Sequence, residues 1–374
     1  MTKIKKYEFF NIPEEYSIAD YKKSTNHIIE RYSKINGLVS IYNWGDPSIP
    51  GISDIDIVLV FKDNADNPLN LLNRSFYFLD DKTRYLVRHP FIFIDAGSFK
   101  KARYIYPNTN FKLLHGKSIK IDKLSPDDEY YSKIALLNDI ITRHYPRDFI
   151  EQFADKNINI RDTLLRLNSL KYSIKILESL TKEKNARWNV KLRLIENLRK
   201  NWFKAKDFNL LVLLNGDAFH ITMDIIEKFR IFLIRNNLVN IYYGDKIRYN
   251  GIKNKALFIK NWGKTRALQE MLNTIKNKQK FYSILPIELS AQLIEYSKCS
   301  GLISSHIRKN ISNDIDYQLK YKRVAENRIS ILNKQAELAS KLRHSDFAAF
   351  FDFGYRNKHG INNWILSLSD KLRF

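Results

Sequence analysis

Two aspartates, Asp54 and Asp56, stand two residues apart at the head of an apolar, β-branched run. Side chains of a strand alternate between its faces, so both carboxylates are expected on one face, with Ile55 and Ile57 pointing into the core. Neighbouring carboxylates repel each other unless a cation lies between them, and oxygen ligands of this kind suit Mg²⁺, with Mn²⁺ as an alternative. The pair predicts a divalent metal site, although the same pattern also occurs where acids simply cap a strand.

A third carboxylate, Asp95, ends a second apolar strand over residues 91–94, which is entered through His89 and Pro90. If this strand lies beside residues 55–61, Asp95 completes a cluster of three acids. Such a cluster can hold two ions ~3.5–4 Å apart, which stabilise both the attacking and the leaving oxygen of a phosphoryl displacement. Asp80 and Asp81 are rivals for the third acid, but their segment is more typical of a turn.

A turn precedes the aspartate pair and is a candidate phosphate-binding segment. Gly45 ends an apolar strand, and the backbone N–H groups of residues 45–51 can approach a triphosphate. Asp46 follows directly, and its carboxylate repels a triphosphate unless it points away. Ser48 and Ser53 are then the candidates for a hydroxyl donor.

This order of elements resembles the DNA polymerase beta-like nucleotidyltransferase superfamily, which includes poly(A) polymerases and tRNA nucleotidyltransferases. The resemblance spans roughly residues 20–120 and rests on Trp44-Gly45-Asp46, Ser53-Asp54-Ile55-Asp56-Ile57 and Ile94-Asp95. It implies that the three acids bind metal, that Asp95 helps to deprotonate the acceptor, and that the turn holds the triphosphate of an NTP, with ATP expected. Such enzymes also carry a basic residue for the terminal phosphates, for which the candidates are Arg166, Lys171 and Lys175. A solvated basic stripe is the alternative for these three.

The chain has 374 residues, with 63 Lys and Arg against 40 Asp and Glu, a formal net charge of +23. Cys299 is its single cysteine, which excludes a disulfide scaffold and a Cys-rich zinc site. The eight histidines form no zinc-ligand pair within a helix, so they are expected on the surface or in the core. No apolar run approaches the ~20 residues needed to cross a bilayer. These features predict a soluble cytoplasmic protein without membrane contact.

The excess positive charge is C-terminal, because residues 1–123 carry a net charge of +5 and residues 124–374 carry +18. It is concentrated in residues 161–206 and 246–280. The second stretch contains Tyr249, Phe258 and Trp262 between its basic residues. Basic and aromatic side chains together suit single-stranded nucleic acid, and a solvated face over an aromatic core is an equal alternative.

Periodicity predicts an α+β fold: a mixed sheet with helices, then a mainly helical region with a small β insert. The resemblance implies that the sheet is of the nucleotidyltransferase type. A helix is expected over residues 18–35 and strands over 38–42, 55–61 and 91–94. Helices are expected over 127–145, 161–180, 191–203, 219–234 and 313–343. Strands are expected over 239–243, 246–249 and 256–259, with Gly244-Asp245 as a hairpin turn. The expected domains are a catalytic domain (1–123), a helical substrate-binding domain (124–237) and the β insert with a basic helical region (238–374).

These patterns together predict a Mg²⁺-dependent nucleotidyltransferase that moves a nucleoside monophosphate from an NTP to an acceptor hydroxyl and releases pyrophosphate. The positive charge favours an RNA 3′ end, or another polyanion, as the acceptor. The alternatives are transfer to a small molecule or a protein, and a nucleic-acid-binding subunit with a degenerate site, for which Asp46 is the indication.

Overall fold

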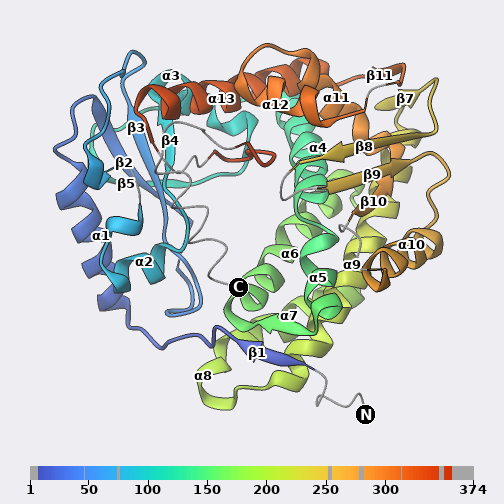
Figure 1. The fold of residues 1–374 in the computed structure, drawn as a ribbon, viewed down its shortest axis with the longest axis horizontal. Helices are drawn as coiled ribbons and strands as arrows, with labels where there is room; N and C mark the ends of the chain where they lie inside the picture. The colour runs from blue at the N-terminus through green and yellow to red at the C-terminus, as the bar shows by residue number, and fades with distance from the viewer. Residues whose placement is uncertain are drawn as a thin grey trace. The chain divides into compact units, whose positions relative to one another are not determined.

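A computed structural model describes residues 7–45, 47–73, 76–251, 255–277, 282–312, 314–344 and 349–355 (Figure 1). The chain forms two compact units. The first, here called the sheet unit, consists of residues 16–129, 299–306 and those from 326 onward. The second, the helical unit, contains the N-terminal strand, residues 130–298 and residues 307–325.

The sheet unit is built on four strands in the order β4-β3-β2-β5. Strand β2 (Leu38–Trp44) runs antiparallel to both β3 (Asp56–Phe61) and β5 (Phe111–Gly116). Strand β4 (Ile92–Asp95) runs parallel to β3, with Val58 opposite Ile92 and Phe61 opposite Asp95. The heads of β3 and β4 therefore lie side by side, and so do their ends.

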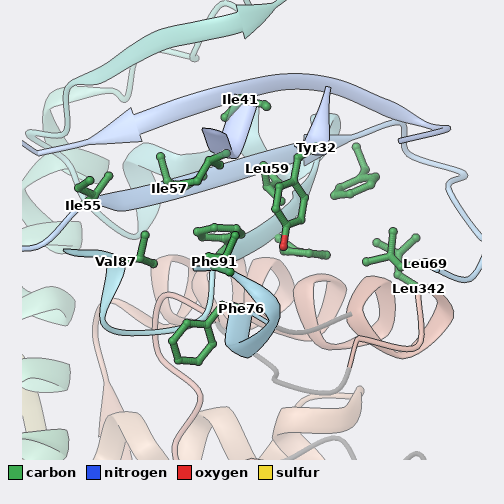
Figure 2. Close-up of a cluster of buried hydrophobic side chains, with 14 of the residues drawn as sticks. Tyr32, Ile41, Ile55, Ile57, Leu59, Leu69, Phe76, Val87, Phe91 and Leu342 are labelled. Carbon is green, nitrogen blue, oxygen red and sulfur yellow. The ribbon is translucent and has the colours of Figure 1, made fainter. Parts of the chain in front are cut away.

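One face of this sheet is covered by helices (Figure 2). Helix α1 (Ile18–Tyr32) begins with a capping box between Ser17 and Asp20 and buries Ile28 and Tyr32. Ile55, Ile57 and Leu59 face the same core. Helix α2 (Asp81–Val87), the three-residue helices at Leu71–Asn73 and Phe76–Phe78, and the residues beside them supply further apolar side chains: Leu69, Phe76, Leu79, Leu86 and Val87.

Helix α13 (Lys322–Lys341) completes the core of the sheet unit from far along the chain. Leu338 and Leu342 are buried in the same cluster as the β3 side chains. Gln335 Nε2 donates to the Phe93 carbonyl at 3.0 Å, and Arg328 Nη1 donates to the Ile105 carbonyl at 2.9 Å. The remaining helices of this unit are α3 (Ala96–Lys100), the short turn Ala102–Tyr104 and the first part of α12 (Leu302–Asn310).

The helical unit contains long helices that contact one another. Helices α6 (Ile160–Thr181), α7 (Ala186–Lys200) and α9 (Phe208–Arg235) pack together, and their N-caps are Asn159, Asn185 and Asp207. Each cap side chain accepts a backbone N–H of the first turn, which satisfies donors that a helix start leaves open. The other helices are α4 (Pro126–Arg143), α5 (Arg147–Asp155), α8 (Trp202–Ala205), α10 (Lys264–Lys276), Ile287–Leu289 and α11 (Ser290–Lys298).

Three small sheets belong to the helical unit. Strands β8 (Lys246–Asn250) and β9 (Lys255–Ile259) are antiparallel, and β10 (Ser283–Pro286) adds to β9 in parallel. Strand β7 (Val239–Ile241) pairs with β11 (Tyr317–Leu319), and β1 (Glu8–Phe10) pairs with β6 (Asn157–Asn159).

The expected hairpin at Gly244-Asp245 is wrong, because β7 pairs with β11 and not with β8. A Cβ at Gly244 would lie 2.9 Å from the Asp314 carbonyl, so glycine is required where the segment before β11 passes this turn. The long helix expected over 313–343 begins only at Lys322, after β11.

The α+β class expected from the sequence is confirmed, with a mixed N-terminal sheet followed by a mainly helical region that contains small sheets. Within the described ranges, no helix combines the length and the apolar character needed to cross a membrane.

Candidate metal centre

The head of β3 presents the two aspartates on one side of the sheet. Asp54 lies two residues before the first residue of the strand, Asp56, and Ile55 and Ile57 are buried in the core. The Ile55 N–H donates to the Leu86 carbonyl at 2.9 Å, which ties this segment to α2. The side chains of Asp54 and Asp56 are 20% and 30% exposed. The period-2 arrangement predicted from the sequence thus leaves both carboxylates within reach of a ligand.

A histidine from the head of β4 completes the cluster. His89 Nε2 lies 2.7 Å from Asp56 Oδ1, and His89 Nδ1 lies 2.9 Å from the Pro90 carbonyl. One ligand atom from each of Asp54, Asp56 and His89 lies within 4.8 Å of the other two. Arg88, whose φ of 67° turns the chain at this point, places Nη1 3.8 Å from Asp54 Oδ2. Two acids, one imidazole and a guanidinium therefore meet at the heads of the parallel strands.

The charges in this cluster are mutually dependent. Burial and the neighbouring Asp56 carboxylate raise the pKa of Asp54, although His89 and Arg88 act in the opposite direction. Burial alone would lower the pKa of His89, but the hydrogen bond to Asp56 and the charges of Asp56 and Asp54 outweigh it and raise the pKa to about 9. At neutral pH His89 is therefore an imidazolium that donates from both nitrogens, which its two oxygen partners fit. The two acids thus already attract two cationic groups, His89 and Arg88.

Asp95 does not join Asp54 and Asp56, and the expected convergence of three carboxylates is wrong. Asp95 pairs in register with Phe61, the last residue of β3, whereas Asp56 is the first. Five residues at ~3.3 Å each put roughly 16 Å between the two ends of the strand. Asp95 instead caps α3, and its side chain accepts the Ser98 N–H at 2.8 Å. The prediction failed because it assumed that the two strands are adjacent but did not take their relative direction into account.

The turn after β2 approaches the metal centre. Gly45 is exposed with a φ of 92°, and a Cβ built there would lie 3.8 Å from Asp56 Oδ2. Ser48 is exposed, whereas Ser53 is buried and its Oγ accepts the Ile49 N–H at 3.1 Å. Asp46 lies outside the described residues. Gly45 and Ser48 thus remain accessible to a ligand, while Ser53 serves the shape of the turn.

Tyr21 of α1 holds the far side of this turn in place. Its hydroxyl accepts the Gly51 N–H at 3.0 Å and donates to the Ser53 carbonyl. The side chain is 3% exposed, so the anchor lies within the core. The turn leading into Asp54 is therefore fixed by the helix that covers the sheet.

Arg166, Lys171 and Lys175 lie on α6 in the helical unit. Arg166 is engaged within that unit, where Nη1 donates to the Asp148 carbonyl at 3.2 Å and Nε lies 4.0 Å from Asp148 Oδ2. Lys171 Nζ lies 5.2 Å from the centroid of the exposed Tyr172 ring, and Lys175 is exposed. Burial, Arg199 and Lys175 lower the pKa of Lys171. Arg166 is thus part of an ion pair, and the two lysines are the accessible cations.

The aromatic residues of the second basic stretch belong to the core. Tyr249, Phe258 and Trp262 are 1%, 0% and 6% exposed, so none offers a ring face for stacking a base. Lys246 and Arg248, which alternate with buried residues on β8, are exposed. Of the two interpretations of this stretch, a solvated basic face over an aromatic core is the one that the structure confirms.

Asp80, the rival third acid, is the N-cap of α2 and accepts the Thr83 N–H at 2.9 Å. The turn expected at this point is therefore the start of a helix.

His89 is the residue that sequence reasoning missed. It stands directly before a Pro-led strand, but no second histidine at zinc-ligand spacing within a helix accompanies it in the sequence. A parallel pairing of β3 and β4 would have pointed to it, because residues that precede two parallel strands meet at the same edge of a sheet.

No family model matches the chain, and no curated protein matches it. One solved structure that is similar is the crystal structure of spectinomycin adenyltransferase AAD(9) from Enterococcus faecialis with ATP and spectinomycin. The similarity covers 55% of this chain and 100% of that chain, at 11% identity and a TM-score of 0.30. A TM-score this low does not establish a common fold.

Proposed function

We propose that this protein is a metal-dependent nucleotidyltransferase, which transfers a nucleoside monophosphate from an NTP, ATP first, to an acceptor hydroxyl. The observation that carries this proposal is the cluster of Asp54, Asp56 and His89, whose ligand atoms lie within 4.8 Å of one another beside the exposed Gly45 turn. In the reaction the acceptor hydroxyl gives its proton to water and its oxygen bonds to the α-phosphorus, while the bond from that phosphorus to the bridging oxygen breaks and pyrophosphate leaves.

The donor set fits a divalent cation. Two carboxylates supply hard oxygen ligands, and the imidazole adds a nitrogen that Mn²⁺ accepts more readily than Mg²⁺. A bound ion would polarise the phosphoryl oxygens and offset their negative charge. Asp54 and Asp56 would hold it, and His89 would join them as the neutral imidazole after giving up its proton.

The turn over residues 45–53 is suited to the triphosphate. Gly45 is exposed and lies beside Asp56, so backbone N–H groups can approach a phosphate bridged to the metal. Tyr21 fixes the Gly51 and Ser53 backbone behind it. Nucleotide and metal would then share one edge of the sheet.

For the acceptor we infer a polyanion, with an RNA 3′ end as the case to test. Residues 124–374 carry a net charge of +18, and Lys171, Lys175, Lys246 and Arg248 are among the cations that reach solvent. Binding through such cations follows phosphate charge, so its affinity falls steeply as salt rises.

The test incubates the protein with ATP labelled at the α-phosphate, Mn²⁺ or Mg²⁺, and an RNA oligonucleotide with a free 3′ hydroxyl. We expect label on the RNA, none on the same RNA with a 3′-deoxy end, and none with an Asp54→Asn and Asp56→Asn double variant. Asp66→Asn is the matched control, because Asp66 is an exposed acid of the same unit and lies outside the cluster.

Label on the protein or on a small alcohol would support nucleotidyl transfer and would show that the acceptor is a protein or a small molecule and not RNA. Salt-sensitive RNA binding with no label on any acceptor would overturn the enzyme and leave a degenerate nucleic-acid-binding subunit.

A further inference from the structure

A second ligand-sized site lies at the opposite end of the same two strands. A cavity of about 290 Å³ opens within the sheet unit where β3 and β4 end. The lining residues that carry charge or leave space are Asp63, Asp95, Gly97, Lys334, Glu337 and Lys341. Its volume is at the lower limit of ordinary small-molecule pockets.

Two carboxylates meet at one wall of this cavity. Asp63 Oδ1 accepts the Gly97 N–H at 2.7 Å, and Asp95 Oδ1 accepts the Ser98 N–H at 2.8 Å. A Cβ built on Gly97 would lie 3.3 Å from each of these Oδ1 atoms, so glycine leaves the space between the two acids open.

Asp95 is more than a helix cap. Its side chain is only 7% exposed, and among the described residues its Oδ2 atom is buried without a hydrogen-bond partner. A buried carboxylate oxygen without a hydrogen-bond donor costs free energy, and a cationic donor is the partner that satisfies it best. Asp95 lines the cavity, so a cationic group bound there lies beside this carboxylate.

Another part of the lining belongs to α13 and carries charges of both signs. Lys334, Glu337 and Lys341 are exposed and follow one another at helical spacings of three and four residues, which places them along one face. The cavity therefore has an acidic wall formed by the loops after β3 and β4 and a wall with two lysines.

We propose that this cavity binds a small zwitterion, with its ammonium group on Asp63 and Asp95 and its carboxylate or phosphate on Lys334 and Lys341. A metal ion fits less well, because the cavity exceeds the size of an ion and, among the described residues, two carboxylates meet at Gly97. A purely anionic ligand would face the two acids, and a simple amine would leave the lysines unused.

This site is independent of the proposed nucleotidyl transfer. Asp95 lies five residues, roughly 16 Å, along the strand pair from Asp56. Binding at the cavity is measured without nucleotide or divalent metal, so either proposal can fail alone.

The experiment is calorimetric titration of the full chain in EDTA with β-alanine, O-phosphoethanolamine, ethanolamine and inorganic phosphate. We expect one of the two zwitterions to bind with a single-site isotherm, ethanolamine at least about tenfold more weakly, and phosphate not at all. The two zwitterions distinguish a carboxylate from a phosphate ligand.

Asp95→Asn and Asp63→Asn should each weaken zwitterion binding about tenfold or more. Both variants keep an oxygen for the backbone N–H, and Asn is as good an N-cap as Asp, so the fold is retained. Lys334→Gln with Lys341→Gln should weaken the zwitterion and spare ethanolamine. Asp66→Asn, an exposed acid of the same loop, is the control.

Absence of binding by both zwitterions would overturn the proposal. So would an affinity that both Asn variants leave unchanged while their unfolding midpoints match the wild type.

Discussion

Asp54 and Asp56 look alike in the sequence, but their surroundings differ. Asp56 Oδ1 lies 2.7 Å from His89 Nε2, whereas Asp54 Oδ2 lies 3.8 Å from Arg88 Nη1. Burial and Asp56 raise the pKa of Asp54, so ionising this side chain in the folded protein costs free energy of folding. Asp56, in contrast, is neutralised by the imidazolium that it holds.

We therefore expect opposite effects from two identical substitutions. Asp54→Asn should stabilise the metal-free protein by about 0.5–1 kcal/mol, as removal of a charge held for function commonly does. Asp56→Asn should destabilise it by about 0.5–1 kcal/mol, the scale of a partly exposed ion pair. Urea unfolding in EDTA measures both, and midpoints that move in the same direction would show that the two acids do not differ as described.

His89 should set the metal preference. With an imidazole in the donor set, we expect Mn²⁺ to bind more tightly than Mg²⁺, and His89→Asp to lower the ratio of the two affinities about tenfold, because carboxylate oxygens suit Mg²⁺. Mn²⁺ titration followed by electron paramagnetic resonance, with Mg²⁺ as competitor, gives this ratio.

His27→Asp is the matched control, since His27 also lies beside an acid, 3.8 Å from Asp80, on the same unit. A ratio that His89→Asp leaves unchanged would remove His89 from the ligand set.

At this scale the sequence could predict Asp54 and Asp56 but neither His89 nor the true place of Asp95. The pair rests on the period of a single strand, which is local. The third member depends on which ends of β3 and β4 adjoin, and nothing between residues 61 and 92 states that direction. The burial of Tyr249, Phe258 and Trp262 depends likewise on contacts beyond their own strands.

Among the elements, the segment that directly follows α13 carries a buried titratable group. His344 is 3% exposed, and its ring centroid lies 4.1 Å from that of Phe93 on β4. Burial lowers the pKa of His344 to about 3. The neutral imidazole packs on the sheet, and protonation opposes that packing.

We expect stability to fall as pH drops below the unfolded pKa of about 6.5, because the unfolded chain then binds a proton that the folded chain refuses. The loss from His344 should reach about 2 kcal/mol at pH 5 and continue to grow towards pH 3. His344→Leu removes this part of the slope. Urea unfolding at pH 7 and pH 5 tests it, and an equal slope in variant and wild type would contradict the assignment.

Most long elements could be predicted because their signals are local: α1 ends within three residues of its expected bound, and β3 begins one residue late. Partners could not be predicted in the same way. Gly244 and Asp245 have the composition of a hairpin turn, yet β11, some seventy residues later, takes the place beside β7.

At the scale of the whole molecule, the sheet unit is discontinuous. Leu338 and Leu342 complete its hydrophobic core. Gln335, which donates to the β4 backbone at Phe93, lies 242 residues after Phe93 in the sequence. No composition shift marks residues 326 onward as companions of the N-terminal sheet, because such pairing appears only in the packed structure.

A chain that ends at residue 325 should therefore lose the folded sheet. Removing two fully buried leucines alone costs about 3–6 kcal/mol, a large part of the ~5–15 kcal/mol that holds a domain. We expect hydrogen exchange of the β3 amides to become fast in this fragment. A fragment ending at residue 355, which keeps every described residue, should retain protection. Slow exchange of β3 in the shorter fragment would show that α13 is dispensable.

The Tyr21 hydroxyl, which hydrogen-bonds to the backbone of Gly51 and Ser53, has a consequence for how the proposed nucleotide would bind. A loop that becomes ordered only when its ligand binds loses conformational entropy, and this cost reduces the affinity. Tyr21 already orders the Gly51 and Ser53 backbone in the folded protein, so this part of the ordering would not be subtracted when the proposed nucleotide binds. The contribution of this segment to affinity would therefore be set during folding.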